Sequence, residues 1–196
     1  VAFSLVNGIL IRPLPFPQDR ELVSLRERRA SGEELTLSFP NFEDWRAETH
    51  AFQGITALCF PEELTILGGT EPTRGTVVRV SREFFTVLGA QPFLGRPILP
   101  EENRDGGRPV VVVSYEFWDR ALGGNEELEA LSVTMGPNSY QVVGVMPPGF
   151  KVLEEADIYS PLELSPLRIR DSHNYRAIAR LADRATLGGA KTEMDG

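Results

Sequence analysis

The side chains that could do chemistry are few and widely spaced in this sequence. His50 and His173 are the only histidines, and neither has a second ligand at metal-binding spacing. Cys59 is the only cysteine, which excludes an intrachain disulfide. It lies in an apolar run without the basic neighbour that would make its thiol nucleophilic. These residues therefore favour structural histidines and a small buried thiol over a catalytic or metal centre.

Two groups of carboxylates are the remaining candidates. Glu62 and Glu63 resemble the acid pair of a glycosidase, but neighbours in a strand point to opposite faces of its sheet. A later loop holds Glu101, Glu102 and Asp105, which carry the oxygen ligands that calcium prefers. Its spacing differs from an EF-hand and two arginines lie inside it, so the pattern favours a solvated loop. We therefore expect no catalytic residue, no cofactor and no metal.

Motifs for nucleotide binding and for serine nucleophiles are absent from the sequence. It contains no Walker A motif, no Gly-x-Gly-x-x-Gly and no Gly-x-Ser-x-Gly. The net charge is −8, and the densest basic cluster, at 26–29, has an acid inside it. Because contacts to nucleic-acid phosphates need clustered positive charge, the composition argues against nucleic acid as a partner.

The pattern of hydrophobic, capping and turn residues predicts the helices and strands of a folded protein. Hydrophobic residues make up 41% of the 196 residues, enough for one sizeable core or two small lobes. Helices are predicted from Ser38 to about His50 and from Ser114 to Gly123, whereas two glycines in 186–190 oppose a helix. Strands are predicted at 21–28, 55–60, 63–67, 76–80, 110–113, 131–135, 140–145, 156–159 and 174–181.

The stretch 77–96 changes its hydrophobic period in the middle. Its first part alternates like a half-buried strand, and Ser81 then suits a helix N-cap. Apolar residues follow at helical spacing up to Gly89, and Pro92 forbids continuation. We interpret this stretch as the seam between two parts of the molecule. The aromatic residues at helical spacing favour core positions over a ligand platform; they are Phe42, Trp45, Phe84, Phe85, Phe117 and Trp118.

Six stretches resemble, in the same order, the MacB-like periplasmic core domain, the extracytoplasmic part of FtsX-like ABC-transporter permeases. They are RPLPF at 12–16, SFPNFEDWR at 38–46, the stretch 80–96, VVVS at 111–114, FW at 117–118 and VVGVMPPGF at 142–150. The resemblance covers nearly the whole chain and implies a non-enzymatic scaffold. Together with the predicted elements it indicates an α+β fold of two lobes, a split βαβ-type layer and a mixed α/β insertion lobe.

The domain organisation follows from the seam and from a proline-rich return at 160–172. We expect residues 17–80 and 172–196 to form a porter-like lobe with one shared sheet, and 81–171 to form an inserted lobe. Residues 1–16 resemble the membrane-proximal end of a transmembrane or stalk helix, with Arg12 at the interface. A buried first strand and a core helix are the alternatives, because no apolar run is long enough to span a bilayer.

The resemblance implies a location and a role. It places the domain on the periplasmic side of the inner membrane, where it would relay ATP-driven motion of transmembrane helices in an export or lipoprotein-release system. The implied partners are a cytoplasmic ATPase, a periplasmic adaptor or lipoprotein, and a second copy of the permease. The alternative from another class is a hydrolase domain of unrecognised type.

Overall fold

The computed structural model describes residues 2–6, 21–28, 34–163 and 173–195. The helices are α1 Phe39–Glu48, α2 Phe84–Leu88, α3 Tyr115–Leu122 and α4 Leu187–Asp195, with a short 3-10 helix η2 Leu128–Ala130. The strands are β1 Ala2–Val6, β2 Leu22–Arg28, β3 Glu34–Leu35, β4 Phe52–Cys59, β5 Glu62–Leu67, β6 Thr73–Val80, β7 Leu94–Gly95, β8 Val110–Val113, β9 Ser132–Met135, β10 Asn138–Val145, β11 Ile158–Pro161 and β12 Tyr175–Leu181.

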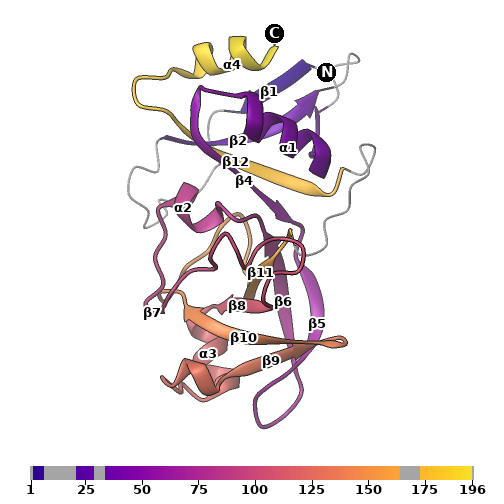
Figure 1. Ribbon diagram of the computed structural model, residues 1–196, viewed down its shortest axis with the longest axis vertical. Helices are drawn as coiled ribbons and strands as arrows, with labels where there is room; N and C mark the ends of the chain where they lie inside the picture. Colours follow the sequence, from indigo (N-terminus) through magenta and orange to yellow (C-terminus); the bar gives the residue numbers. More distant parts are fainter. Residues whose placement is uncertain (1, 7–20, 29–33, 164–172, 196) are drawn as a thin grey trace.

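One continuous sheet runs through the described strands in the order β1-β2-β12-β4-β6-β11-β8-β10-β9-β5. β5 pairs with β6 as well as with β9, so the last six strands close into a ring. Figure 1 shows a helix-covered sheet at one end of the long axis and this ring at the other. We call them the terminal lobe (β1–β4, β12, α1 and α4) and the barrel lobe (β5–β11 and α3). The expected two-lobe α+β fold is confirmed.

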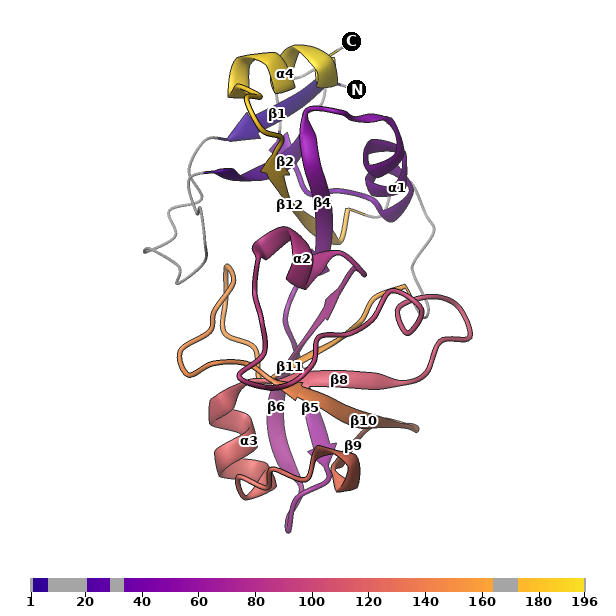
Figure 2. The ribbon, with the colours of Figure 1, turned by 60° about the vertical axis from the view of Figure 1, so that its left-hand side comes forward.

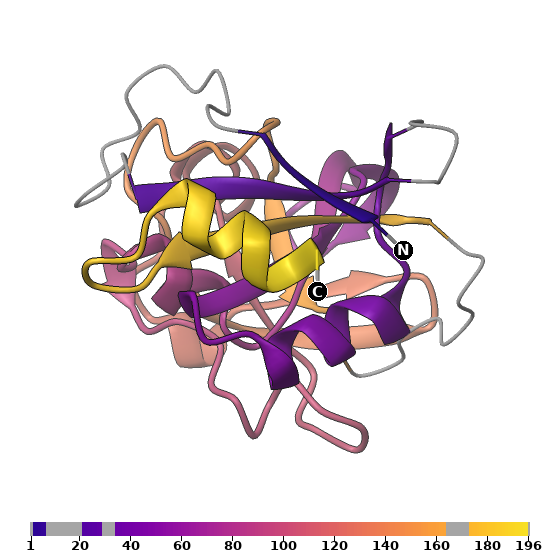
Figure 3. The ribbon, with the colours of Figure 1, turned by 90° about the horizontal axis from the view of Figure 1, so that it is seen from above.

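The terminal lobe contains the predicted split βαβ layer. β2 leads through α1 to β4, and β12 lies between these two strands, antiparallel to both. The Ser38 hydroxyl caps α1 by accepting a hydrogen bond from the Asn41 N–H. Phe39, Phe42 and Trp45 recur at helical spacing and are buried against the sheet. α4 packs into the same apolar cluster, and Figure 3 shows it close to β1.

The barrel lobe is organised around β8, whose four valines are all buried. Val111 and Val113 pack with α3, whereas Val110 and Val112 pack on the other side with α2. This explains why the strand reads as a continuous apolar run rather than as an alternation. Ser114 is the N-cap of α3, as predicted, since its hydroxyl accepts a hydrogen bond from the Phe117 N–H, and Gly123 is the C-cap.

The N-terminal expectation is wrong for the residues that the structure describes. Ala2–Val6 form strand β1, which pairs antiparallel with β2, and not the end of a helix. This matches the alternative of a first strand, because β2 offers a free edge for backbone hydrogen bonds there. Residues 7–16, including Arg12, lie outside the described residues.

The strand pairings also differ from a division of the chain at Ser81. β12 pairs with β2 and β4, as expected for residues 172–196 and 17–80. However, β5 and β6 pair with β9 and β11 and complete the ring, and the strand pairing of β6 with β4 is limited to Leu58 opposite Val80. The period change at Ser81 marks the end of a strand, and Pro61, between β4 and β5, is the point at which the chain enters the barrel lobe.

The last segment is more ordered than its glycines indicate. Residues 187–195 form α4 although Gly188 and Gly189 lie in its first turn. The Thr186 hydroxyl accepts a hydrogen bond from the Gly189 N–H, and Ala190 and Met194 are buried against the sheet. Burial of this apolar face outweighs the low helix propensity of two glycines.

Candidate functional site: the junction between the two lobes

The two lobes meet where β6 ends beside β4. The Val80 carbonyl accepts two hydrogen bonds, from the Leu162 N–H at 2.9 Å and from the Asn103 side chain at 2.8 Å. The next residue, Ser81, donates its N–H to the Ala57 carbonyl of β4. The end of β6 is therefore tied to three chain segments at once.

The Ser81 side chain corrects a prediction. It does not cap α2, whose N-cap residue is Glu83 and carries no side-chain capping bond. Instead, its hydroxyl lies 2.8 Å from the Thr56 hydroxyl and accepts a hydrogen bond from the Ala57 N–H. Ser81 is buried between β4 and β6, where these partners are in reach. The serine thus stabilises the junction rather than the helix.

The short helix α2 is the apolar half of the junction and lies between the lobes (Figure 2). Phe84 and Phe85 are buried, and their rings contact Tyr159 of β11 at centroid distances of 5.7 and 6.2 Å. On its other side, α2 lies on β4 and β12, where Arg180 Nε donates to the Val87 carbonyl at 2.8 Å. One helix therefore contacts strands of both lobes.

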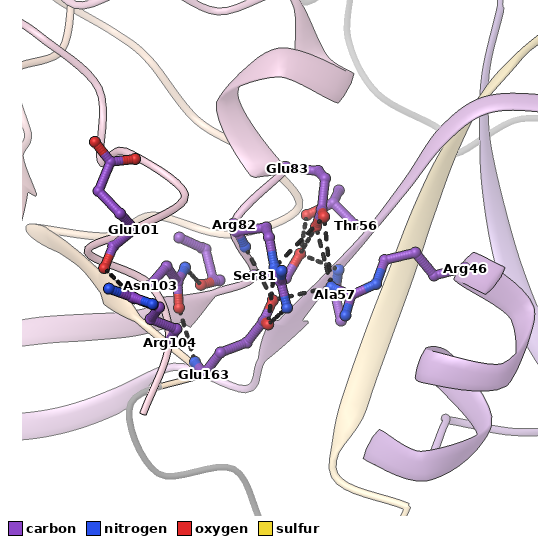
Figure 4. A network of polar contacts seen from close by, with 11 residues as sticks. Arg46, Thr56, Ala57, Ser81, Arg82, Glu83, Glu101, Asn103, Arg104 and Glu163 are labelled. Carbon is purple, nitrogen blue, oxygen red and sulfur yellow. Dashed lines mark hydrogen bonds and ion pairs between the residues drawn. The ribbon is translucent and has the colours of Figure 1, made fainter. Parts of the chain in front are cut away.

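The polar half of the junction centres on Glu163, two residues after β11 (Figure 4). Its side chain is only 6% exposed, and its carboxylate binds two arginines from different parts of the chain. Arg46 of α1 reaches it at 3.0 Å, and Arg82, before α2, binds it through Nε at 2.9 Å and through Nη2. The Glu163 N–H in turn donates to Asn103. This single carboxylate links the terminal lobe, the start of α2 and the barrel lobe.

The electrostatics distinguish the two acids of this network. Burial alone would raise the pKa of Glu163, but the hydrogen bond from Arg82 and the charge of Arg46 outweigh it, and the pKa is lowered. Burial raises the pKa of Glu83, which Arg46 opposes only in part and the charge of Glu163 reinforces. Glu163 is therefore the fixed anion of the junction, and Arg46 lies between both acids.

The loop considered above as a calcium site has a structural role in this region. Glu102 is buried and accepts two hydrogen bonds of 2.7 Å from Arg96. It also accepts the Leu99 N–H, and the next residue is Asn103, which binds Val80 and Glu163. The charged loop therefore packs onto the end of β6 instead of being solvated throughout.

The other sequence candidates are not brought together. His50 is exposed beside Glu193, whereas His173 lies near Glu27 at 3.5 Å. Burial raises the pKa of the Cys59 thiol to about 11, the opposite of an activated nucleophile. In the described part of the chain, no three His, Cys, Asp or Glu side chains form a metal-binding group. The six aromatic residues expected in the core are all buried there.

Glu62 and Glu63 do not form an acid pair with a shared task. Glu62 binds Arg79 at 2.9 Å, whereas Glu63 accepts a hydrogen bond from Thr76 and lies near Arg74.

Sequence reasoning missed Arg82, Asn103 and Glu163, because their partners are distant in the chain. No helix among the described residues is long and apolar enough to cross a membrane.

Comparisons with known proteins agree with this architecture. The family model of the MacB-like periplasmic core domain matches residues 1–196. No curated protein matches the sequence. Among solved structures, the periplasmic region of MacB from Actinobacillus actinomycetemcomitans is similar with a TM-score of 0.68 at 15% identity, covering 89% of this chain and 80% of that one.

Two further solved structures share the fold. A domain of a putative permease from Porphyromonas gingivalis gives a TM-score of 0.66 at 12% identity, over 87% of this chain and 79% of that one. The extracellular domain of the noncanonic ABC-type transporter YknZ from Gram-positive bacteria gives 0.62 at 15% identity, over 92% and 86%. At these identities the structures establish the fold, and the family model establishes the family.

Proposed function

The chain belongs to the family of MacB-like periplasmic core domains of ABC-transporter permeases, and from this we propose that it transmits motion as a stiff, non-catalytic unit. The motion would begin with ATP hydrolysis by a cytoplasmic ATPase and reach this domain through transmembrane helices. The domain would turn as one body and move a periplasmic adaptor, lipoprotein or exported substrate. The observation that supports the proposal is the junction, whose buried carboxylate, aromatic cluster and strand contacts connect the two lobes.

The positions of β1 and α4 support a single point of entry for force. These segments come from opposite ends of the sequence but contact each other at the far end of the terminal lobe (Figures 1 and 3). The barrel lobe lies at the other end of the long axis. A rotation applied near β1 and α4 is therefore amplified at the barrel lobe, provided that the junction does not bend.

The junction has the composition of a rigid connection. It combines a continuous sheet, an aromatic cluster around Tyr159 and a carboxylate held by two arginines. Packed cores and buried ion pairs resist small deformations, because bending would separate charges that are shielded from water. A hydrolase has no comparable support, since the one thiol has a raised pKa and the histidines lie apart.

The test measures distances in the full-length permease with its ATPase in lipid nanodiscs. Spin labels at Glu48 of α1 and Ser139 of β10, in a Cys59→Ala background, report the separation of the lobes. We expect the distance between the two labels to be the same with ATP and with ADP. The distance from residue 139 to spin-labelled lipid headgroups should change between these nucleotide states.

Two variants control this measurement. Glu163→Ala removes the shared anion and should broaden the distance distribution between residues 48 and 139, whereas Glu71→Ala, at an exposed turn, should not. A shift of the 48–139 distance with nucleotide in the otherwise unmodified protein would show a hinge and overturn the proposal. The proposal would also be overturned if the distance from residue 139 to the lipid headgroups stayed the same in every nucleotide state.

A further inference from the structure

An open groove runs along the barrel lobe. It has a volume of about 1090 Å³ and lies beside β7, β10 and η2. Its apolar lining residues are Leu94, Leu128, Ala130, Val142 and Val143. Val142 and Val143 are buried in the core, so the accessible apolar side chains are those of Leu94, Leu128 and Ala130, and we call Leu94 and Leu128 the groove floor. This volume is slightly above the roughly 300–1,000 Å³ that is usual for small-molecule sites. The groove therefore has room for a chain segment.

Negative charge predominates among the residues that line the groove. Glu126, Glu127 and Glu129 line one wall, and in the part of the chain that the structure describes they form no ion pair. Arg96 on the opposite side is neutralised by its paired bonds to Glu102, which leaves Arg108 as the only unpaired cation in the lining. The carboxylates outnumber this cation by three to one, so the groove attracts positive charge and repels phosphates and anionic lipids.

The acidic wall is held in place by hydrogen bonds to its backbone. Gln141 of β10 donates from its side-chain amide to the carbonyls of Leu128 at 2.6 Å and Leu131 at 2.7 Å. Trp118 Nε1 donates to the Asn125 carbonyl at 2.9 Å, just before the glutamates. A wall fixed in this way loses little conformational freedom when a ligand binds.

We propose that this groove binds an extended segment of a partner protein in which basic side chains alternate with apolar ones. The apolar side chains would pack against the floor, and the basic ones would face the three glutamates. β7 pairs with β10 on one side and, among the described strands, has no neighbour on the other. An extended segment is the form that adds to such an edge. This proposal rests on the proposed function for the existence of a periplasmic partner. The groove itself shares no residue with the network of Arg46, Arg82 and Glu163.

The experiment uses the 196-residue chain and two synthetic peptides of equal length. One is acetyl-Lys-Val-Lys-Leu-Lys-Val-amide, and the other carries glutamate in place of each lysine. Methyl NMR shifts of the groove floor are followed during titration at low and high salt. We expect the basic peptide to shift these methyl groups with an affinity at least tenfold above that of the acidic peptide, and this advantage to shrink at high salt.

A triple variant tests whether the three glutamates of the wall cause the preference for the basic peptide. Glu126→Gln, Glu127→Gln and Glu129→Gln together should weaken binding of the basic peptide about tenfold. The matched control replaces three exposed acids elsewhere, Glu48→Gln, Glu71→Gln and Asp105→Asn, and should leave the affinity within twofold.

Three results would overturn the proposal: no shifts at millimolar basic peptide, equal binding of both peptides, or equal weakening by the two triple variants. None of these results would affect the distances that test the junction, so failure of the groove proposal is distinguishable from failure of the proposed function.

Discussion

The two lobes differ in how their strands are connected along the chain. Every strand of the barrel lobe lies between Glu62 and Pro161, whereas the terminal lobe pairs β2 with β12, as in Leu25 opposite Ala177. The terminal sheet therefore closes only when the intervening chain is compact, because an unfolded loop of that length costs conformational entropy. We therefore expect the barrel lobe to be the self-contained unit and the terminal lobe to depend on it.

The sequence supplies a separate probe for each lobe. It has two tryptophans, Trp45 on α1 in the terminal lobe and Trp118 on α3 in the barrel lobe, and both are buried. In a Trp118→Phe background, fluorescence reports the terminal lobe. In a Trp45→Phe background, it reports the barrel lobe. Urea unfolding followed in both backgrounds measures the stability of each lobe separately.

The largest expected effect comes from Phe39→Ala in the terminal lobe. Phe39 is fully buried, with its ring 5.6 Å from that of Phe42 and 5.7 Å from that of Tyr175. Its truncation should lower the free energy of unfolding reported by Trp45 by about 3–4 kcal/mol, through lost burial and a cavity. The transition reported by Trp118 should move much less.

Phe93→Ala is the control, because Phe93 is 60% exposed. Equal shifts of both probes would show that the two lobes unfold as one cooperative unit and would contradict a self-contained barrel lobe.

The reciprocal test is Gly69→Ala in the barrel lobe. A Cβ on Gly69 would lie 2.1 Å from the Ala121 carbonyl of α3, so the β5–β6 turn or the helix must move. We expect a loss of about 2 kcal/mol, visible to both tryptophans if the terminal lobe depends on the barrel lobe. Thr70→Ala in the same exposed turn should change little. If Trp45 reported no loss, the terminal lobe would be stable without an intact barrel lobe.

Local signals in the sequence predicted most of the elements but not their assembly. The caps Ser38 and Ser114 and the glycine at Gly89, with φ 63°, act within one helical turn, and so they can be read from neighbouring residues. The pairing of Ile66 with Met135, which closes the ring, joins segments that nothing local connects. A period change therefore located the end of β6 but could not assign β6 to a lobe.

The junction was unpredictable for the same reason. Glu163 gives no local signal, because it follows a short strand and its partners Arg46 and Arg82 are 117 and 81 residues away. The prediction that Ser81 caps a helix was wrong, because its flanking sequence fits an N-cap whereas its hydroxyl accepts a hydrogen bond from the Ala57 N–H of β4. Long-range polar contacts of this kind depend on the completed fold, and residue spacing carries no record of them.

A smaller effect is expected from Glu163→Gln, which tests whether the lobes are coupled. At neutral pH the variant should lose about 1–2 kcal/mol in both tryptophan backgrounds, because two arginines lose a buried anion. The folded-state pKa of Glu163 is lowered, so its contribution is present above the ordinary glutamate pKa of about 4.3 and is lost as the pH falls through the folded value. The difference between variant and wild type should therefore shrink in acid.

Glu83→Gln is the matched control for this prediction. Burial raises the pKa of Glu83, so its charge is disfavoured in the folded state and its removal should cost less at neutral pH than that of Glu163. Urea titrations at pH 7 and pH 3.5 measure both differences. Equal losses for the two variants, or a Glu163→Gln loss that persists in acid, would contradict the role of Glu163 as the fixed anion.

The smallest effect is a gain, from Gly188→Ala in α4. A Cβ on Gly188 would meet no atom within 4 Å, and alanine restricts the unfolded chain more than glycine does. We expect a gain of about 0.5 kcal/mol in the terminal lobe, reported by Trp45, and no change at Trp118. Gly189→Ala is the control, since its Cβ would lie 3.3 Å from the Thr186 hydroxyl that caps the helix, and its gain should be smaller. A gain seen equally by both probes would mean that α4 stabilises the whole molecule, and the dependence between the lobes would then run in both directions.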